Sequence, residues 1–169
     1  MTTKIKTTGK SLLELRDKYP QHFYVTEDAW YEKEAFASEK PPAGEYEFDF
    51  DTRLTNLSSD EQKANLPQGF EVPHAATLVE AMIVHFEATG ERVFKDCFAS
   101  TKCRTSAGRL PVVGDFDGSG LDVDGWDGSR SSRVGCGASR KLRGFETPES
   151  LTARVEKLEA IIKHHNLTV

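Results

Sequence analysis

One segment in the second half of the chain, Asp115–Arg133, holds the densest group of side chains that could do chemistry. It reads DFDGSGLDVDGWDGSRSSR, and thirteen of its nineteen residues are Asp, Gly or Ser. Carboxylates crowded among small residues fit three kinds of site. They can coordinate calcium, act as a catalytic acid–base pair, or form a loop that contacts another molecule.

A calcium loop fits only the first half of this segment. Asp115, Asp117 and Ser119 match the first three ligand positions of an EF-hand loop, and a glycine follows at its turn. The closing position needs a bidentate acid, but Trp126 stands there. A loop of the β-propeller type fails as well, because Val123 replaces the acid it needs. We therefore predict no metal site and no cofactor.

An enzymatic site is the second alternative for the aspartates. Five of them lie close together, but nothing in the pattern singles out two as an acid–base pair. The chain also has no nucleophile elbow, no phosphate loop and no His-Glu zinc motif. We predict that the protein is not an enzyme and assign no catalytic residue. A hydrolase that uses the aspartates ranks third among the functions considered.

A contact surface is the alternative that the composition favours. A tryptophan among Ser, Gly and Asp is typical of binding loops, in which an aromatic anchor is surrounded by adaptable polar groups. Trp126 is the predicted anchor, and Arg130 and Arg133 are expected to pair with acidic groups on a partner. The predicted ligand-binding residues are Asp122, Asp124, Trp126, Asp127, Ser129, Arg130, Ser131, Ser132 and Arg133.

Strands on both sides are expected to hold this surface in place. Apolar residues alternate before it and again after it, from Val134 to Ala138. The segment before it reads as two strands joined at Gly118–Gly120. Because regular elements bracket the polar residues, we predict a held loop rather than a slack linker.

Three helices are predicted upstream, over Ser11–Tyr19, Ser59–Leu66 and Pro73–Thr89. Ser58 and Glu61 form a capping box at the start of the second helix. Pro73 suits the first turn of the third helix, and Gly90 suits the position after its end. Between the first two helices, the residues from Thr26 to Phe36 fit either a helix or an irregular packed segment.

Strand patterns complete an α+β fold class. Glu45–Asp51 alternates strictly between aromatic and acidic residues, which predicts a half-buried strand. From Arg92 onward, short apolar stretches alternate with glycine-rich joints, which predicts a small antiparallel sheet. We expect one domain over residues 1–145 and a helical tail over residues 146–169.

Composition and charge narrow the range of partners. The chain is 37% hydrophobic and 29% charged, which is ordinary for a soluble globular protein, and its net charge of −5 has no concentrated basic face. Nucleic acid is therefore not an expected partner. No apolar run is long enough to cross a membrane. Three cysteines, Cys97, Cys103 and Cys136, match no zinc spacing, and we expect buried free thiols.

The run GLDVDGWDGSRSSRVGCGASRKL resembles the C-terminal part of C-type-lectin-fold domains of the formylglycine-generating-enzyme type. Gly125-Trp126-Asp127 resembles their closing tryptophan segment, and Val134-Gly135 through Arg140 resembles the strand that follows a polar stretch. The proline-led helix from Pro73 is in keeping with them. The activity of the enzymes is not carried over, because it depends on cysteines in a much larger domain.

More specifically, the chain resembles the variable proteins of diversity-generating retroelements, which are found in phages and in bacteria that include candidate phyla. The resemblance covers about residues 70–142. It implies a C-type-lectin-like scaffold with a hypervariable ligand-binding surface, here within about residues 115–140. In that family, mutation at template adenines turns asparagine codons into codons for Asp, Ser, Gly and Arg, which are the residue types found here. The implied partner is a protein or another macromolecule.

The last residues predict a further interface. Leu151, Val155, Leu158 and Ile162 repeat at alternating spacings of four and three, as in a short coiled coil. This pattern predicts a homo-oligomer, with a trimer favoured over a dimer, or docking of the helix onto its own domain. The second-ranked function is accordingly a structural or assembly protein, of phage origin in one version, that oligomerises through this helix.

The first fifteen residues, MTTKIKTTGKSLLEL, lack the apolar core of a secretory signal. We therefore expect a cytoplasmic protein. Export within a virion or by another non-classical route is the alternative.

Overall fold

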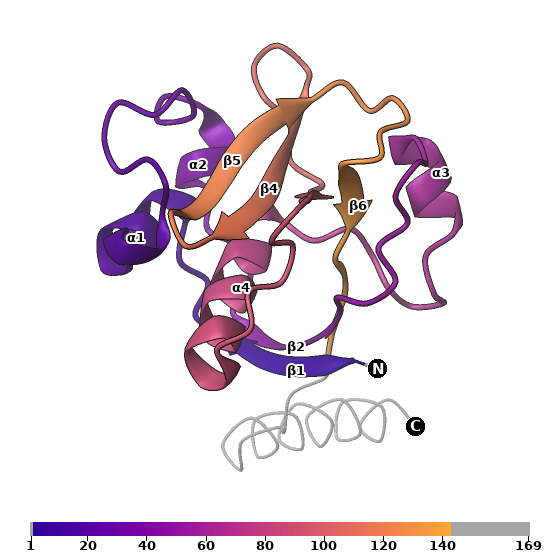
Figure 1. Ribbon diagram of the computed structural model, residues 1–169, viewed down its shortest axis with the longest axis horizontal. Helices are drawn as coiled ribbons and strands as arrows, with labels where there is room; N and C mark the ends of the chain where they lie inside the picture. The colour runs from indigo at the N-terminus through magenta and orange to yellow at the C-terminus, as the bar shows by residue number, and fades with distance from the viewer. Residues whose placement is uncertain (1, 143–169) are drawn as a thin grey trace, which may run out of the picture.

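The computed structural model describes residues 2–142, which form an α+β fold with two small sheets and four α-helices (Figure 1). The three-stranded sheet has the order β1 (Thr3–Thr7), β2 (Gly44–Asp49) and β7 (Ala138–Lys141). The four-stranded sheet has the order β5 (Gly120–Trp126), β4 (Leu110–Asp117), β3 (Phe98–Ser100) and β6 (Val134–Cys136). The helices are α1 (Leu12–Lys18), α2 (Ala35–Ser38), α3 (Ser59–Ala64) and α4 (Ala75–Thr89), with a 3-10 turn at η1 (Pro20–His22).

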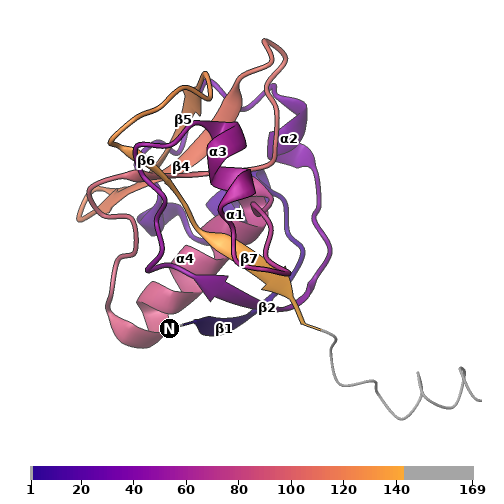
Figure 2. The same cartoon turned by 90° about the vertical axis from the view of Figure 1, so that its right-hand side faces the viewer.

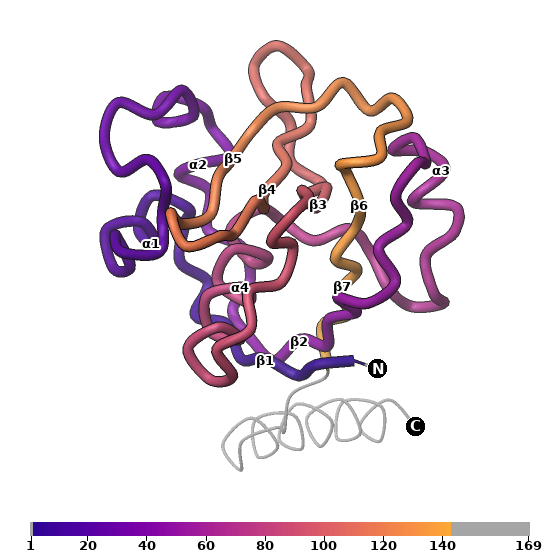
Figure 3. Tube along the Cα trace, viewed as in Figure 1, coloured from indigo at the N-terminus to yellow at the C-terminus, as the bar shows by residue number. Residues whose placement is uncertain are grey.

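The two sheets are joined where β6 runs directly into β7 (Figure 3). β6 pairs with β3 of the four-stranded sheet, and β7 pairs with β2 of the other. The sequence-based expectation of one antiparallel sheet is therefore wrong in two respects. The β3–β6 pair is parallel, and β7 belongs to the second sheet. The loop after β5 crosses the sheet, so β6 lies on the other side of β3 from β4. Val134, at the start of β6, is in register with Phe98 of β3, which is itself in register with Gly114 of β4 and through it with Asp122 of β5. The chain of β6 therefore runs in the same direction as β3.

Local capping signals place the helices as the sequence predicts. Ser11 and Ser58 each complete a capping box, and Gly90 ends α4 with a left-handed φ of 76°. The start of α4 is corrected. Its N-cap is His74, whose Nδ1 accepts a hydrogen bond from the Ala76 N–H at 3.1 Å, so Pro73 lies outside the helix. The stretch before α2 is irregular, which is the second of the two alternatives for that segment.

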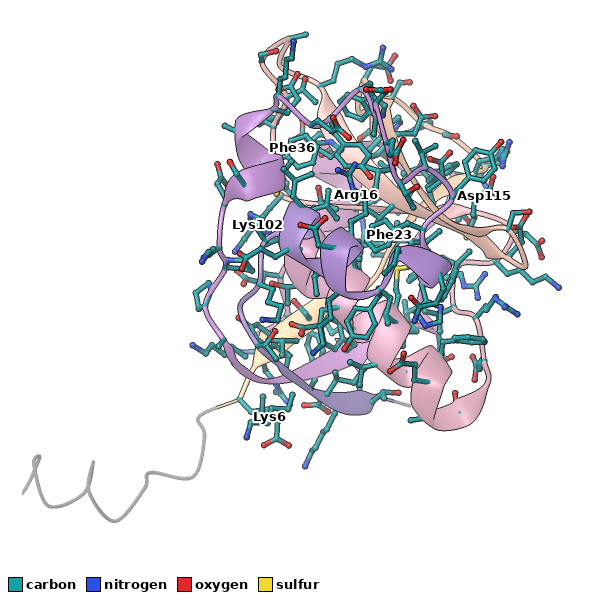
Figure 4. The ribbon with its side chains drawn as sticks, turned by 90° about the vertical axis from the view of Figure 1, so that its left-hand side faces the viewer. Lys6, Arg16, Phe23, Phe36, Lys102 and Asp115 are labelled. Atoms are coloured by element: carbon teal, nitrogen blue, oxygen red, sulfur yellow. The ribbon has the colours of Figure 1, made fainter. Side chains whose placement is uncertain are left out.

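Helix α4 forms the centre of the core. Every residue from Ala75 to Ile83 is buried, and the helix packs against β1 of one sheet and β4 of the other (Figure 2). The predicted β2 alternation is confirmed, because Tyr46 and Phe48 point into this core. Figure 4 shows Phe23 and Phe36 directed inward from the segment around α1 and α2, where both are buried.

None of the helices in residues 2–142 combines the length and apolar character needed to cross a bilayer. The predicted coiled-coil seam, Leu151 to Ile162, lies outside the described residues.

Candidate functional site

The polar segment from Asp122 to Arg133 divides into two structural parts. Asp122 to Trp126 belongs to β5, where Leu121 and Val123 point into the core and the alternating residues face outward. Residues 127–133 form the loop to β6. Backbone hydrogen bonds of 2.9 Å join this loop to the start of α3, from the Ser59 N–H to the Gly128 carbonyl, and to the chain before α3, from the Asn56 N–H to the Ser131 carbonyl. The loop is held, as the flanking strands predict.

Trp126 is not available as a binding anchor, which corrects the prediction. Its side chain is only 6% exposed, and its indole Nε1 donates a hydrogen bond of 2.9 Å to the Ser129 carbonyl. It belongs to a small cluster on the outer face of the sheet, with Phe98, Leu110, Val112 and Val134. The ring therefore stabilises the loop from beneath.

The two arginines also differ from the prediction, because both already pair within the chain. Arg130 binds Glu61 of α3 through two hydrogen bonds of 2.7 and 2.8 Å. Arg133 lies 3.3 Å from the Asp115 carboxylate. The Arg130 guanidinium, together with the Ser58 N–H, lowers the pKa of Glu61 to about 2. Both arginines therefore have a carboxylate partner within the described residues, while their side chains stay 71% and 63% exposed.

The small polar residues of the loop shape its turns. The Asp127 carboxylate accepts hydrogen bonds from the Ser129 N–H at 2.9 Å and the Ser129 hydroxyl at 2.6 Å. The Ser131 hydroxyl accepts one from the Arg133 N–H at 3.1 Å. Ser132 is exposed. Most of the side chains between Asp127 and Arg133 therefore have a structural partner.

Asp122 and Asp124 have no such role in the described residues. Each accepts a hydrogen bond from the N–H of the next residue, and neither forms an ion pair within residues 2–142. Asp124 is exposed and Asp122 is half-buried. Burial raises the pKa of the Asp122 carboxyl, and the charges of Asp124 and Asp115 raise it further. These carboxylates face outward from β5 and have no ion pair within residues 2–142.

Two aromatic residues that the sequence analysis missed lie beside them. Tyr24 is 61% exposed and Trp30 is 48% exposed, and they are the exposed large hydrophobic residues of the described chain. The Tyr24 N–H donates to the Leu121 carbonyl and the Trp30 Nε1 donates to the Val123 carbonyl, each at 2.9 Å. Both hydrogen bonds fix the 24–30 segment along the outer edge of β5. The signal that the sequence offered for these two residues was the presence of aromatic side chains in a segment without a clear helix pattern.

Close backbone approach at the start of β5 depends on a glycine. Gly120 has a φ of +108°, and a Cβ there would lie 2.6 Å from the Phe23 carbonyl carbon. The glycine therefore lets the chain at Phe23 pair with Leu121, which places Tyr24 over β5.

Each exposed aromatic residue lines a hollow against β5. The Trp30 hollow has a volume of about 280 Å³ and is lined by Trp30, Glu34, Thr105, Ala107, Arg109, Asp124 and Gly125. The Tyr24 hollow has a volume of about 410 Å³ and is lined by Tyr24, Asp115, Asp117, Ser119, Gly120 and Asp122. A β-bulge after Gly114 contributes to the second hollow, because it turns Asp115, with a φ of 49°, out toward Asp122.

The two hollows differ in the charged and polar groups that line them. The Arg109 guanidinium donates to the Gly125 carbonyl at 2.9 Å beside the Trp30 ring, so an aromatic face and a cation share one rim. Three aspartates line the Tyr24 hollow. One of them, Asp117, accepts a hydrogen bond from the Ser119 N–H and so stabilises the turn between β4 and β5. No His, Cys or Lys lines either hollow. The lining therefore combines acidic groups with one arginine and with the hydroxyl groups of Thr105, Ser119 and Tyr24.

A separate group of potential metal ligands lies outside these hollows. Glu39, His74 and Cys103 place one ligand atom each within 4.8 Å of one another. His74 is 35 residues from Glu39 in the sequence. No short spacing motif could have revealed the group, because folding alone brings the three segments together.

Comparison of the chain with protein-family models, with curated proteins and with solved structures found no match.

Proposed function

We propose that this protein is a non-enzymatic binding protein with a C-type-lectin-like scaffold, whose outward face at β5 contacts a macromolecular ligand. The observation that carries the proposal is the position of Tyr24 and Trp30. They are exposed at 61% and 48%, and both lie against the strand that presents Asp122 and Asp124. Exposed aromatic rings among polar groups are typical of interaction surfaces, because the ring adds contact area without flexible side-chain torsions.

The positions of the resembling segments support the lectin-like scaffold. Gly125-Trp126-Asp127 falls at the end of β5, the polar stretch forms the loop, and Val134-Gly135 opens β6. Pro73 immediately precedes the N-cap of α4. In addition, the first and last described strands share the β1-β2-β7 sheet, so the residues between β1 and β7 form one closed unit.

The proposed surface differs from the sequence-based one in its anchor. Trp30 and Tyr24 replace Trp126, while Asp122, Asp124, Ser129 and Ser132 keep their role as outward polar groups. Arg130, Arg133, Asp127 and Ser131 position the loop. A protein ligand suits this mixture of aromatic, acidic and hydroxyl groups better than nucleic acid, whose phosphates require a basic face.

The diversification implied by the resemblance is tested in DNA. The region that flanks the gene should contain a reverse-transcriptase gene and a near-copy of the codons for residues 115–140, differing at template adenines. Sequencing the gene across a population should then show variation at Asp122, Asp124, Ser129 and Ser132. Trp126 should stay unchanged, because it is buried beneath the loop. The absence of both flanking elements would contradict a diversified surface.

Binding itself is tested on the protein. A display library that randomises Asp122, Asp124, Tyr24 and Trp30 should yield binders to a chosen globular protein while keeping the melting temperature of the scaffold. A matched library that randomises Trp126, Asp127 and Arg130 should yield unfolded clones. Equal yields of folded binders from the two libraries would remove the distinction on which the proposed surface depends.

The coiled-coil pattern over residues 148–165 supports a second candidate, an assembly protein. Light scattering on the full chain and on a variant without residues 146–169 separates the two functions. Assembly through this segment requires an oligomer that becomes a monomer on deletion, whereas a full-length monomer rules the assembly function out.

A further inference from the structure

The N-terminus of α4 combines three side chains whose atoms suit a transition-metal ion. Cys103 is 6% exposed, and its Sγ accepts a hydrogen bond from the Ala75 N–H at 3.4 Å. The His74 imidazole accepts the Ala76 N–H through Nδ1 and lies 3.1 Å from the Glu39 carboxylate through Nε2. Thiol, imidazole and carboxylate thus meet at one point on the surface of the core.

The residue types at this helix start are unusual for a simple cap. Ser, Thr, Asp and Asn are the common N-cap residues, whereas α4 uses a histidine, and the neighbouring orphan N–H is taken by a cysteine. Burial raises the pKa of the Cys103 thiol, while the hydrogen bond from the Ala75 N–H lowers it and the helix macrodipole favours negative charge at this end. The 15-residue α4 is long enough to present such a dipole.

The spacing of the three atoms is close to that of a zinc site. Zinc bonds of about 2.0–2.3 Å in a tetrahedron place ligand atoms about 3.3–3.6 Å apart. The His74–Glu39 distance is 3.1 Å, and all three atoms lie within 4.8 Å of one another. Rotation of the exposed Glu39 side chain supplies the small remaining movement, since this side chain is 57% exposed.

A small hollow adjoins His74. It has a volume of about 50 Å³, and its lining includes His74, Lys102 and Ser139. Ser139 is 1% exposed, and its hydroxyl has no hydrogen-bond partner within the described residues. The space is sufficient for a water molecule beside His74 and Ser139.

We propose that Glu39, His74 and Cys103 form a binding site for a zinc ion. Binding through His74 Nε2 transfers the ring proton to Nδ1, so the ring gives up its bond from Ala76. The Cys103 thiol loses its proton to solvent, and the two negative ligands balance the charge of the ion. Mixed sulfur, nitrogen and oxygen ligation is a pattern that zinc accepts.

The site would connect three separate segments of the fold. Glu39 follows α2, His74 begins α4, and Cys103 lies just after β3. The residues after Cys103 include Thr105, Ala107 and Arg109, which line the Trp30 hollow. In Figure 4, Lys102, next to Cys103, lies on the opposite side of the view from Asp115 of the Tyr24 hollow. A bound zinc ion would therefore stabilise the segment that lines the Trp30 hollow and leave the Tyr24 hollow unchanged.

Cobalt(II) is the probe that tests the site on the full chain, because it replaces zinc and reports its ligands by absorption. Chelator-treated protein should bind one Co²⁺ per chain, with a thiolate-to-cobalt charge-transfer band, and Zn²⁺ should displace it. The Cys103→Ala variant should lose the band. Cys97→Ala, which removes a thiol of similar exposure at 7%, should keep it.

Two further variants keep the test independent of folding. His74→Asn preserves an N-cap residue and Glu39→Gln alters an exposed side chain, so both should fold. Each should weaken Co²⁺ binding by at least about tenfold, since even changes around a metal ligand cost this much. A wild-type protein without the charge-transfer band, or binding that persists unchanged in these variants through other groups such as His164 and His165, would overturn the proposal.

Discussion

In β5 the carboxylates of Asp122 and Asp124 face outward beside the two hollows, whereas in the next seven residues nearly every polar side chain contacts the protein itself. Aspartates occur in both parts, at Asp122 and Asp124 in β5 and at Asp127 in the loop. The pKa values of two carboxyl groups show how the two parts differ. Arg130 of the loop lowers the pKa of its partner Glu61 in α3 to about 2, whereas burial raises the pKa of Asp122 in β5. Composition alone therefore does not distinguish a side chain that binds a ligand from one that holds the loop.

The two tryptophans extend this comparison. Trp126 lies within the predicted segment and is buried, while Trp30 lies outside it and is 48% exposed. Both donate their indole N–H to a backbone carbonyl at 2.9 Å. The exposed ring of Trp30 is suited to contact a ligand, whereas the buried ring of Trp126 is suited to stabilise the loop.

The largest expected effect separates these rings. Trp126→Ala should destabilise the fold by about 3–5 kcal/mol, because it removes a buried aromatic residue from a small cluster. Trp30→Ala should cost about 1 kcal/mol, since half of the ring is already in water. Urea denaturation measures both. Equal losses would contradict the assignment of support to one ring and contact to the other.

The next effect concerns the helix that holds the loop. Ser58→Ala removes the side chain that accepts the Glu61 N–H, and it should cost about 1 kcal/mol of folding stability. Because α3 carries the partner of Arg130, amide hydrogen exchange should also rise in residues 127–133. Exchange in β5 at Asp122 and Asp124 should not change. A uniform rise over both parts would indicate that they are not independent.

A smaller effect should depend on pH. The pKa of Glu61 is lowered from 4.5 to about 2, so its ionised form contributes stability that is present above about pH 4.5 and is lost as pH falls toward 2. Glu61→Gln keeps the capping box and removes this contribution. The stability difference between wild type and variant should shrink over that range in denaturation curves. A difference that stays constant with pH would exclude the Arg130 pair as its source.

The smallest effect should have the opposite sign. Burial raises the pKa of Asp122, so its native state favours the protonated form, and its contribution falls as pH rises through the folded pKa. Asp122→Asn should therefore stabilise the protein at pH 7, by less than about 1 kcal/mol because the group is partly exposed. Asp124→Asn is the exposed control. A loss of stability in Asp122→Asn would show that this carboxylate has a structural partner like those of the loop.

Several features of the fold could be predicted because their causes are local. The side chains of Ser58 and Glu61 each accept a backbone N–H of the other residue, three positions apart, and Gly90 adopts the left-handed conformation after α4 without the strain that a Cβ would add. The aromatic alternation of β2 was equally clear. The error at Pro73 has a local cause as well, because the ring nitrogen of His74 caps the helix in place of a commoner residue.

The candidate site depended on contacts between distant segments. Alternation along β5 places Trp126 on the same outward face as Asp122 and Asp124. The tertiary structure then covers only one end of that face, where Phe98, Val134 and the loop pack over the ring. The alternation of residues in the sequence is the same at the buried end and at the exposed end of this face of β5, so it does not distinguish them.

The sequence by itself predicted a held polar segment from Asp122 to Arg133, because alternation and turn residues act over a few positions. Only the tertiary structure decided which of those residues face solvent, and that Tyr24 and Trp30 join them. The same holds for Glu39, His74 and Cys103, whose meeting depends on packing between α2, α4 and the end of β3. Interactions between neighbouring residues determine the helices and strands, whereas contacts with distant segments determine which of their side chains stay exposed.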